Sequence, residues 1–386
     1  MLNCGIIGVG NAGNQVVSYA EQEKAPFKLF AINCSAEDLK SIPESINRAL
    51  IGDGRGAGKN RVNSKTSLAK DIMPLIMSDE FKEFMIGLDF LFICSSTGGG
   101  TGSGASLVMT SVINNVYPTV YTINVGIMNC IKDALSTQSN TLEYLHELYE
   151  VMSEPTYMLY DNDKFGSLPI NKMMDTVNRQ IVEDLTVLTG QYNTNTRFTS
   201  MDDKDTINLL KTPGRIVVSQ IKNFKEKDIN ENGIENMLLE NIRKGAHVDL
   251  QKDRIVSYFG IIYNMSQEVA DNFDFGLPKI QQEVGVPLDT WQHLVINEDS
   301  KLPNSVFIIF TGLTKINDRI DKINDRLKEI MDRQKQKEDD DTLNEFNINE
   351  LNAKKAYKET TVSGKPQKVD LNDIFAKFGV TSGSDI

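Results

Sequence analysis

The sequence predicts an α/β protein with a parallel sheet, because apolar runs typical of strands alternate with helical patterns along its first half. Strands are expected at 2–7, 27–32, 90–94, 119–125 and 156–160, with helices between most of them. This alternation is typical of βαβ units with right-handed crossovers. Three glycine-rich loops follow strands, and the carboxyl ends of parallel strands lie at one edge of a sheet. We therefore expect the loops to gather at that edge, where open α/β sheets bind ligands.

The glycine loop at 98–104 is the strongest functional signal. It holds five glycines in seven residues and joins the apolar strand at 90–94 to a helix expected over 105–116. Main-chain N–H groups without Cβ obstruction, next to the positive end of a helix dipole, form an anion site. A phosphate group is the expected ligand. A flexible linker is the bland alternative, but linkers are not flanked by a core strand and an immediate helix.

A first glycine loop, at 8–13, matches the pattern G-x-G-x-x-G and leads into a helix. The pattern alone is weak, and it makes an NAD-dependent oxidoreductase a distant alternative. That function needs an acidic residue at the tip of the second strand to bind a ribose diol. The strand at 27–32 is followed by Asn33 instead, and no His-centred catalytic group is evident. Both observations weaken the oxidoreductase hypothesis.

A further glycine cluster, at 52–58, is followed by a Gly-Lys pair that imitates a P-loop. Asp53 stands where the first P-loop glycine should be, and Asn60 replaces the Ser or Thr that would hold magnesium. The cluster is therefore not a P-loop. A helical pattern with a break near Pro74 then covers 67–87.

The second half of the chain predicts a long helix followed by a smaller α+β unit. The helix at 170–188 carries Asp175, Asn178, Arg179 and Asp184 among its apolar positions. Carboxylate or amide oxygens would accept from the N–H donors of guanine and select it over adenine. A solvated helix face is the alternative for each of these residues. Further strands are expected at 214–221, 254–263, 291–296 and 305–311, and helices at 233–244 and 269–284.

Two amphipathic patterns mark the C-terminal region. The charged helix expected over 315–337 carries an apolar stripe, which predicts docking on the body of the protein more than an autonomous coiled coil. Beyond it the sequence is typical of a disordered tail. Near the end, four apolar residues follow helical spacing after Asp370, a candidate N-cap: Leu371, Ile374, Phe375 and Phe378. A short helix that folds onto a partner is one interpretation, and an incidental pattern is the other.

Composition limits the classes of partner. The formal net charge of the 386 residues is -12, which argues against direct, nonspecific binding of DNA. The four cysteines are far apart and without zinc-site spacing, and they are expected to be reduced core thiols. We expect no leader and no membrane span, and a cytoplasmic protein.

The residues Gly99-Gly100-Thr101-Gly102-Ser103-Gly104, placed after the fourth strand, resemble the specific loop of the tubulin/FtsZ superfamily. The other loops are similar to that family's too, and the TubZ plasmid and phage partition proteins fit best. The resemblance covers about residues 2–312. It implies the tubulin/FtsZ fold: a Rossmann-like GTPase domain at 1–168, a central helix at 169–191, an activation domain at 192–312, a long helix at 313–339 and a flexible tail at 340–386.

The resemblance also implies GTP or GDP with Mg²⁺ as the ligand, the ion being carried by the nucleotide near Asn11 without direct protein ligands. The matching positions in the loops, the guanine-side segment and the central helix are expected to bind GTP: Gly10, Asn11, Ala12, Gln15, Asn33, Ala57, Gly58, Gly99, Gly100, Thr101, Gly102, Ser103, Asp133, Asn162, Asp163, Asp175 and Asn178. Asp133 is assigned only as the acid nearest to the family's ribose-side pair.

Asp202 and Asp205 resemble the paired acids of the loop after the central helix, with which this family acts on the GTP of the neighbouring subunit. Two carboxylates can orient and polarise the attacking water. A slip of one position would make Asp203 the catalytic acid instead. Hydrolysis would then depend on polymerisation, and a head-to-tail contact that does not close on itself gives a filament.

The leading hypothesis is a GTPase that forms filaments and segregates plasmid or phage DNA through a DNA-binding adaptor on its tail. A cell-division or phage-positioning filament would share the chemistry and differ in partners. A nucleotide-binding module that does not polymerise is a further alternative, in which Asp202 and Asp205 are only surface charges. No direct nucleic-acid or membrane contact is expected.

Overall fold

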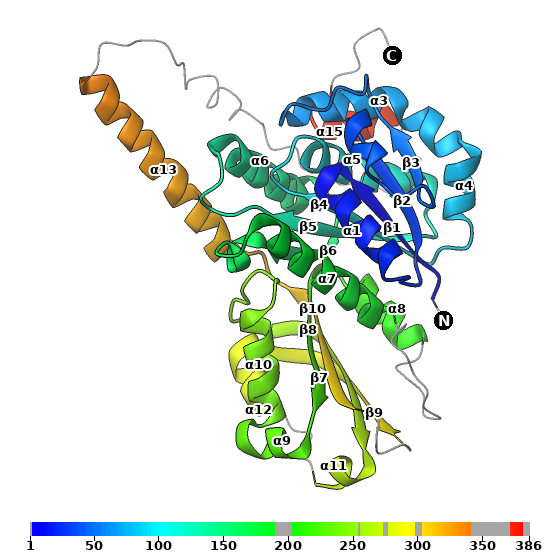
Figure 1. The fold of residues 1–386 in the computed structure, drawn as a ribbon, viewed down its shortest axis with the longest axis vertical. Helices are drawn as coiled ribbons and strands as arrows, with labels where there is room; N and C mark the ends of the chain where they lie inside the picture. Colours follow the sequence, from blue (N-terminus) through cyan, green and yellow to red (C-terminus); the bar gives the residue numbers. More distant parts are fainter. Residues whose placement is uncertain are drawn as a thin grey trace.

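A ten-stranded sheet with helices on both faces organises the part of the chain that the structure describes (Figure 1). The computed structural model describes residues 2–189, 203–253, 255–272, 277–297, 303–340 and 371–380. The strands are β1 (Cys4–Val9), β2 (Lys28–Asn33), β3 (Asn47–Leu50), β4 (Phe90–Ser96), β5 (Tyr121–Met128), β6 (Thr156–Asp161), β7 (Gly214–Phe224), β8 (Ile255–Ser266), β9 (Val286–Asn297) and β10 (Asn304–Leu313).

The strand order is β3-β2-β1-β4-β5-β6-β7-β10-β8-β9. Neighbouring strands are parallel from β3 to β7, antiparallel between β7, β10 and β8, and parallel again between β8 and β9. The predicted α/β fold with a parallel first half is confirmed. The short edge strand β3, which carries no long apolar run, was not singled out by the sequence.

Helices cover both faces of the parallel part of the sheet, which explains why its inner strands, such as β4, carry continuous apolar runs. The helices are α1 (Gly10–Gln22), α2 (Ala36–Lys40), α3 (Arg61–Met77), α4 (Asp79–Met85), α5 (Thr101–Val116), α6 (Leu135–His146), α7 (Ile170–Leu188), α8 (Asp203–Lys211), α9 (Glu226–Asn232), α10 (Ile234–Lys244), α11 (Gln267–Asp271), α12 (Pro278–Val284), α13 (Asn317–Asp340) and α15 (Leu371–Lys377). Two helical turns, η1 (Glu147–Val151) and η2 (Asn162–Phe165), follow α6 and β6.

The core has three apolar clusters. On one face of the sheet, α3, α4, α5 and α6 pack together with α13 and α15. On the other face, α1, α2, α7 and α8 pack against the strands. A third cluster lies between α9–α12 and the strands β7, β8 and β10, in the lower part of Figure 1.

Several expected boundaries differ from the structure. Pro74 lies inside α3, which continues to Met77; the break falls at Ser78, whose hydroxyl accepts from the backbone N–H of Phe81 and caps α4. The helices α1 and α5 begin at Gly10 and Thr101, inside their glycine loops. Both helices therefore present their first backbone N–H groups at the carboxyl edge of the sheet.

The long C-terminal helix α13 docks through its first half, as the apolar stripe predicts. Ile316, just before the helix, and Ile323 are buried in the core, while Ile320 and Leu327 pack at its margin. Figure 1 shows the rest of α13 extending away from the body. None of the helices in the described ranges is long and apolar enough to cross a bilayer.

The four cysteines are free and buried, in agreement with the expectation of core thiols. Burial raises the pKa of each thiol, to about 12 for Cys4 and about 11 for Cys130. Since the thiolate is the reactive form, raised pKa values make these buried thiols poor nucleophiles at neutral pH.

A buried polar cluster ties the central helix α7 to the strands where the two halves of the sheet meet. The carboxylate of Asp184, with no exposed surface, accepts from Tyr160 Oη (2.9 Å) on β6 and Gln220 Nε2 (2.8 Å) on β7. His247 Nε2 lies 2.9 Å from the same carboxylate. A buried carboxylate is stable only with such a set of partners.

We predict that Asp184→Ala lowers the free energy of unfolding by about 3 kcal/mol, because it leaves buried donors without an acceptor. Glu183→Ala is the matched control, since Glu183 pairs with Lys222 in a half-exposed contact (3.1 Å) worth at most about 1 kcal/mol. Urea unfolding followed by circular dichroism measures both. Equal losses in the two variants would contradict the role given to Asp184.

Candidate functional site

The three glycine loops meet at the carboxyl edge of the sheet, as the sequence predicts. A Cβ built on Gly10 would lie 2.8 Å from the backbone N of Gly102, so the first loop is against the third. A Cβ on Gly100 would lie 2.8 Å from Lys59 Cα, so the second loop is also against the third. Both approaches are shorter than a side chain tolerates, and they explain why glycine stands at these positions.

Polar side chains hold the loops at these distances. Asn140 Nδ2, from α6, donates to the carbonyl of Lys59 (2.9 Å) and to that of Gly98 (3.1 Å). Ser64 Oγ, from α3, donates to the carbonyl of Gly100 (2.9 Å). Because Asn140 and Ser64 bind these carbonyl groups, the loop backbone is fixed next to the N-termini of α1 and α5. Residues 10–12, 57–58 and 99–103 together form a candidate phosphate cradle, which is called the cradle below.

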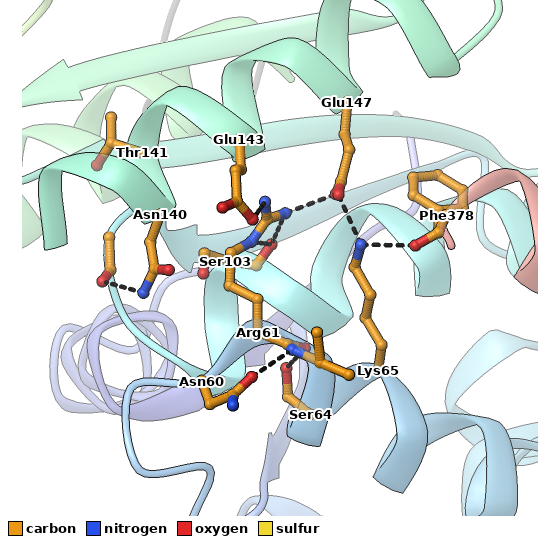
Figure 2. Close-up of polar contacts among 12 residues, drawn as sticks. Asn60, Arg61, Ser64, Lys65, Ser103, Asn140, Thr141, Glu143, Glu147 and Phe378 are labelled. Carbon is orange, nitrogen blue, oxygen red and sulfur yellow. Dashed lines mark hydrogen bonds and ion pairs between the residues drawn. The ribbon is translucent and has the colours of Figure 1, made fainter. Parts of the chain in front are cut away.

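Arg61 supports the cradle by binding its backbone, a role that was not predicted from the sequence. Its side chain is 2% exposed and donates through Nη2 to the carbonyl of Ser103 (2.8 Å). Nη1 binds Glu143 (3.2 Å) and Nη2 also binds Glu147 (2.5 Å), as Figure 2 shows. In the sequence, the run Gly58-Lys59-Asn60-Arg61 was interpreted only by its incomplete match to a P-loop. Its functional feature in the structure is the buried Arg61.

Lys65, one turn further along α3, shares Glu147 with Arg61. Its Nζ lies 2.6 Å from Glu147 Oε1 and 2.8 Å from the carbonyl of Phe378, just beyond α15 (Figure 2). Burial lowers the pKa of Lys65, and the carboxylate of Glu147 opposes this shift. The buried ammonium is therefore tolerated because two oxygens face it.

The predicted GTP-binding residues fall into three groups by exposure. The buried ones are Gly10, Asn33, Ala57, Gly100, Gly102, Ser103 and Asn178; the partly buried ones are Ala12, Gln15, Gly99, Thr101 and Asn162; and the exposed ones are Asn11, Gly58, Asp133, Asp163 and Asp175.

Asn33 is occupied within its own loop. Its Nδ2 donates to Asp38 Oδ2 (3.1 Å), and its Oδ1 accepts from the backbone N–H of Ser35 (3.2 Å). These bonds shape the turn after β2, so a ligand contact would compete with them.

The segment expected to bind guanine, Asn162–Asp163, follows β6 and is held by α13. Arg319 binds Asp161 through Nε (2.8 Å) and Nη2 (2.9 Å), and Nη2 also donates to the carbonyl of Asn129. Burial raises the pKa of Asp161, while Arg319 and the N–H of Asp163 oppose the shift. Asp161 caps η2 through that N–H (3.0 Å). The long C-terminal helix thus positions Asn162 and Asp163, a link that no sequence motif indicates.

Asp175 and Asn178 lie one turn apart on α7, which packs against α1. Burial, mainly, raises the pKa of Tyr19 on α1, and the carboxylates of Glu183 and Asp175 add to the shift. The central helix is therefore adjacent to the helix that begins at the first glycine loop.

Helix α8, which carries Asp205, lies at the opposite edge of the sheet. Asp205 is in the first turn of α8, whose last residue, Lys211, has its Nζ 3.8 Å from the ring centroid of Tyr121, the first residue of β5. Thr156, the first residue of β6, donates to the carbonyl of Thr212 (3.1 Å). Strands of this length separate the two edges by about 20–25 Å. One subunit therefore does not bring α8 to its own phosphate cradle.

The local structure around Asp203 and Asp205 differs from the expected loop. Asp203 and Asp205 belong to helix α8 and not to a loop. Asp205 Oδ2 lies 3.7 Å from His293 Nε2 on β9, and both side chains are 25% exposed. Asp202 lies outside the described residues, as does the side chain of Asp203.

Within the described ranges, no three His, Cys, Asp or Glu side chains form a group suited to a metal ion.

Comparison with known proteins gives the same assignment as the loops. Residues 3–168 match the family model described as Tubulin/FtsZ family, GTPase domain. Residues 3–168 belong to the tubulin/FtsZ family. Among curated relatives of this tubulin/FtsZ domain, the tubulin-like protein CetZ of Pyrococcus abyssi is 27% identical over 195 residues, which make up 47% of this chain and 51% of that protein. The chain thus matches about half the length of this relative.

Solved structures extend the likeness to the whole tubulin/FtsZ fold. TubZ of the Clostridium botulinum phage c-st has a TM-score of 0.66 at 16% identity, over 86% of this chain and 98% of that chain. CetZ2 from Haloferax volcanii, in a GTPγS-bound protofilament, has a TM-score of 0.66 at 19% identity, over 86% of this chain and 100% of that chain. The predicted fold is confirmed.

We predict that Gly104→Ala and Gly99→Ala act differently on the cradle. A Cβ at Gly104 would collide with Ser64 Oγ and lie 2.5 Å from the carbonyl of Arg61, so this change should destabilise the protein by about 1–3 kcal/mol. At Gly99 the nearest atom would be 3.8 Å away, so Gly99→Ala should leave the melting temperature unchanged. Thermal unfolding measures both, and an equal shift in the two variants would show that the cradle is not closely packed.

Proposed function

We propose that this protein is a GTPase that forms head-to-tail filaments and hydrolyses GTP at the contact between successive subunits. The observation that carries the proposal is the separation of the phosphate cradle from Asp205, which lie at opposite edges of one sheet. Stacking subunits along the strand direction would bring the edge of the sheet that carries Asp205, here called the acidic edge, onto the cradle of the next subunit. The likeness to a GTPγS-bound protofilament of CetZ2 supports this arrangement.

The cradle fits the phosphates of GTP. Gly99–Ser103 and Gly10–Ala12 would donate backbone N–H groups, assisted by the dipoles of α5 and α1. The second loop, with Ala57 and the exposed Gly58, would border the γ-phosphate. Mg²⁺, carried with the nucleotide near Asn11, would neutralise phosphate charge.

Guanine would be selected at the other end of the site. Asn162 and Asp163, held by the Asp161–Arg319 pair, and Asp175 and Asn178 on α7 offer oxygen acceptors for its N–H donors. Asp133 would lie on the ribose side.

Hydrolysis would use the acidic edge of the neighbouring subunit. Asp202 and Asp205 would orient a water molecule whose oxygen attacks the γ-phosphorus, with GDP as the leaving group. The proton of the water would pass to a carboxylate or to the released phosphate. The backbone N–H groups of the cradle would stabilise the negative charge that develops.

The cellular role we propose is segregation of plasmid or phage DNA in the cytoplasm. An acidic chain with net charge -12 would reach DNA through a basic adaptor that binds the region 340–386. The similarity in fold to a phage TubZ supports this choice. In this proposal residues 1–168 bind GTP, 169–191 form the central helix, 192–312 carry the acidic residues, and 313–339 form the long helix.

The rate of phosphate release per molecule is predicted to rise with protein concentration, in step with light scattering, because no isolated subunit holds a complete site. The measurement uses GTP, with ATP and NADH as controls for nucleotide class. A rate independent of concentration, without scattering, would contradict the filament mechanism.

Asp205→Asn is predicted to retain GTP binding and assembly but to slow phosphate release by at least about 100-fold, since a positioned base contributes a factor of this order. Asp325→Asn, an exposed carboxylate on α13, is the charge-matched control and should retain the full rate. His293→Gln separates catalysis from the local contact with Asp205. If His293→Gln slowed release as much as Asp205→Asn, the loss would be attributable to that contact and not to a catalytic role.

A further inference from the structure

The C-terminal segment 371–380 is docked on the GTPase domain of its own chain. Three of its apolar residues, Ile374, Phe375 and Phe378, are each less than 8% exposed and belong to the same core cluster as α3 and α5. Figure 1 shows α15 beside these two helices. The sequence allowed either a helix for a partner or an incidental pattern here; the segment forms a helix, and its own domain covers the apolar face.

The end of this segment has a defined geometry. Gly379 adopts a positive φ of 74°, its N–H donates to the carbonyl of Ala376, and the N–H of Val380 donates to that of Phe375 (both 3.0 Å). This Schellman-type ending brings Val380 onto Phe375 and leaves the carbonyl of Phe378 pointing out of the helix end. That carbonyl accepts from Lys65 Nζ, so a cation lies at the negative end of α15.

The contact is continuous with the phosphate cradle. Lys65 and Arg61 bind the two oxygens of Glu147, and Arg61 donates to the carbonyl of Ser103 in the first turn of α5 (Figure 2). The path from Phe378 to the cradle therefore runs through the buried side chains of Lys65 and Arg61 and the partly buried carboxylate of Glu147 between them. A docked segment fixes Lys65 and, through Glu147, the guanidinium that braces Ser103.

Thirty residues, 341–370, separate α13 from α15. Because both segments belong to one chain, docking is an intramolecular binding step with an effective concentration in the range of about 1 mM. The segment is therefore comparable to a peptide ligand that the chain carries with it.

We infer that the surface of α3 and α5 that residues 371–380 cover, called the groove below, is a peptide-binding site whose occupant is this segment of the same chain, and that its occupancy strengthens nucleotide binding through Lys65, Glu147 and Arg61. The second part rests on the proposed binding of GTP. Because coupling between two sites is reciprocal, the nucleotide strengthens docking by the same factor. A partner protein that recognises the apolar face of α15 has to displace it from the groove, and so weakens nucleotide binding in that subunit.

The groove is tested with full-length variants and a fluorescent peptide of residues 369–382, by anisotropy. Ile374→Ser combined with Phe375→Ser removes the resident segment, so the added peptide should bind at least about tenfold more tightly than to the parent chain. Ala376→Ser, an exposed position on the same helix, is the control and should behave as the parent. Equal peptide affinity for all three chains would overturn the groove assignment.

The coupling between peptide binding and nucleotide binding is tested in the Ile374→Ser/Phe375→Ser variant with a GTP analogue that hydrolyses slowly. The analogue should raise peptide affinity at least about fivefold, and adding Lys65→Met, which keeps the aliphatic stem, should abolish that gain. If the analogue binds but leaves peptide affinity unchanged, the coupling is wrong while the GTPase proposal stands. If no chain binds GTP, the proposed function fails, and the peptide comparison still decides the groove.

Discussion

Backbone approaches at the carboxyl edge of the sheet determine the rest of the site. The first and third glycine loops meet where Gly10 lies against Gly102, and the second and third where Gly100 lies against Lys59. Any side chain at these glycines would push the loops apart, and α1, α3 and α5 would have to separate with them. Asn140 and Ser64 hold the approach by binding loop carbonyls. In the proposed function, the backbone N–H groups at the starts of α1 and α5 bind the phosphates of the nucleotide.

Much of the fold could be predicted from the sequence because local patterns and tertiary structure agree. Buried parallel strands require continuous apolar runs, and the run at 90–94 has that form. Boundaries were less predictable where side chains cap a helix. Ser78 ends one helix and starts the next, and Pro74 is accommodated inside α3.

The loops of the site were predictable and their supports were not. Glycine patterns are local, whereas Arg61, Glu147 and Arg319 act on residues far away in the chain: Arg61 on Ser103, and Arg319 on Asp161. A single charged residue on a helix is usually solvated, so neither arginine stands out in the sequence. For the same reason the amphipathic pattern at 371–378 could indicate a helix, but not the surface that it covers.

In the proposed mechanism a complete active site needs two subunits. Mixing two inactive variants tests this requirement most directly. Asp205→Asn keeps the cradle, while Gly99→Glu places a negative charge beside the phosphates at a position with room for a side chain. Each variant alone should release almost no phosphate. An equal mixture should recover about a quarter of the normal rate, because about a quarter of random head-to-tail contacts join an intact cradle to an intact acidic edge. A mixture as inactive as its components would contradict a shared site.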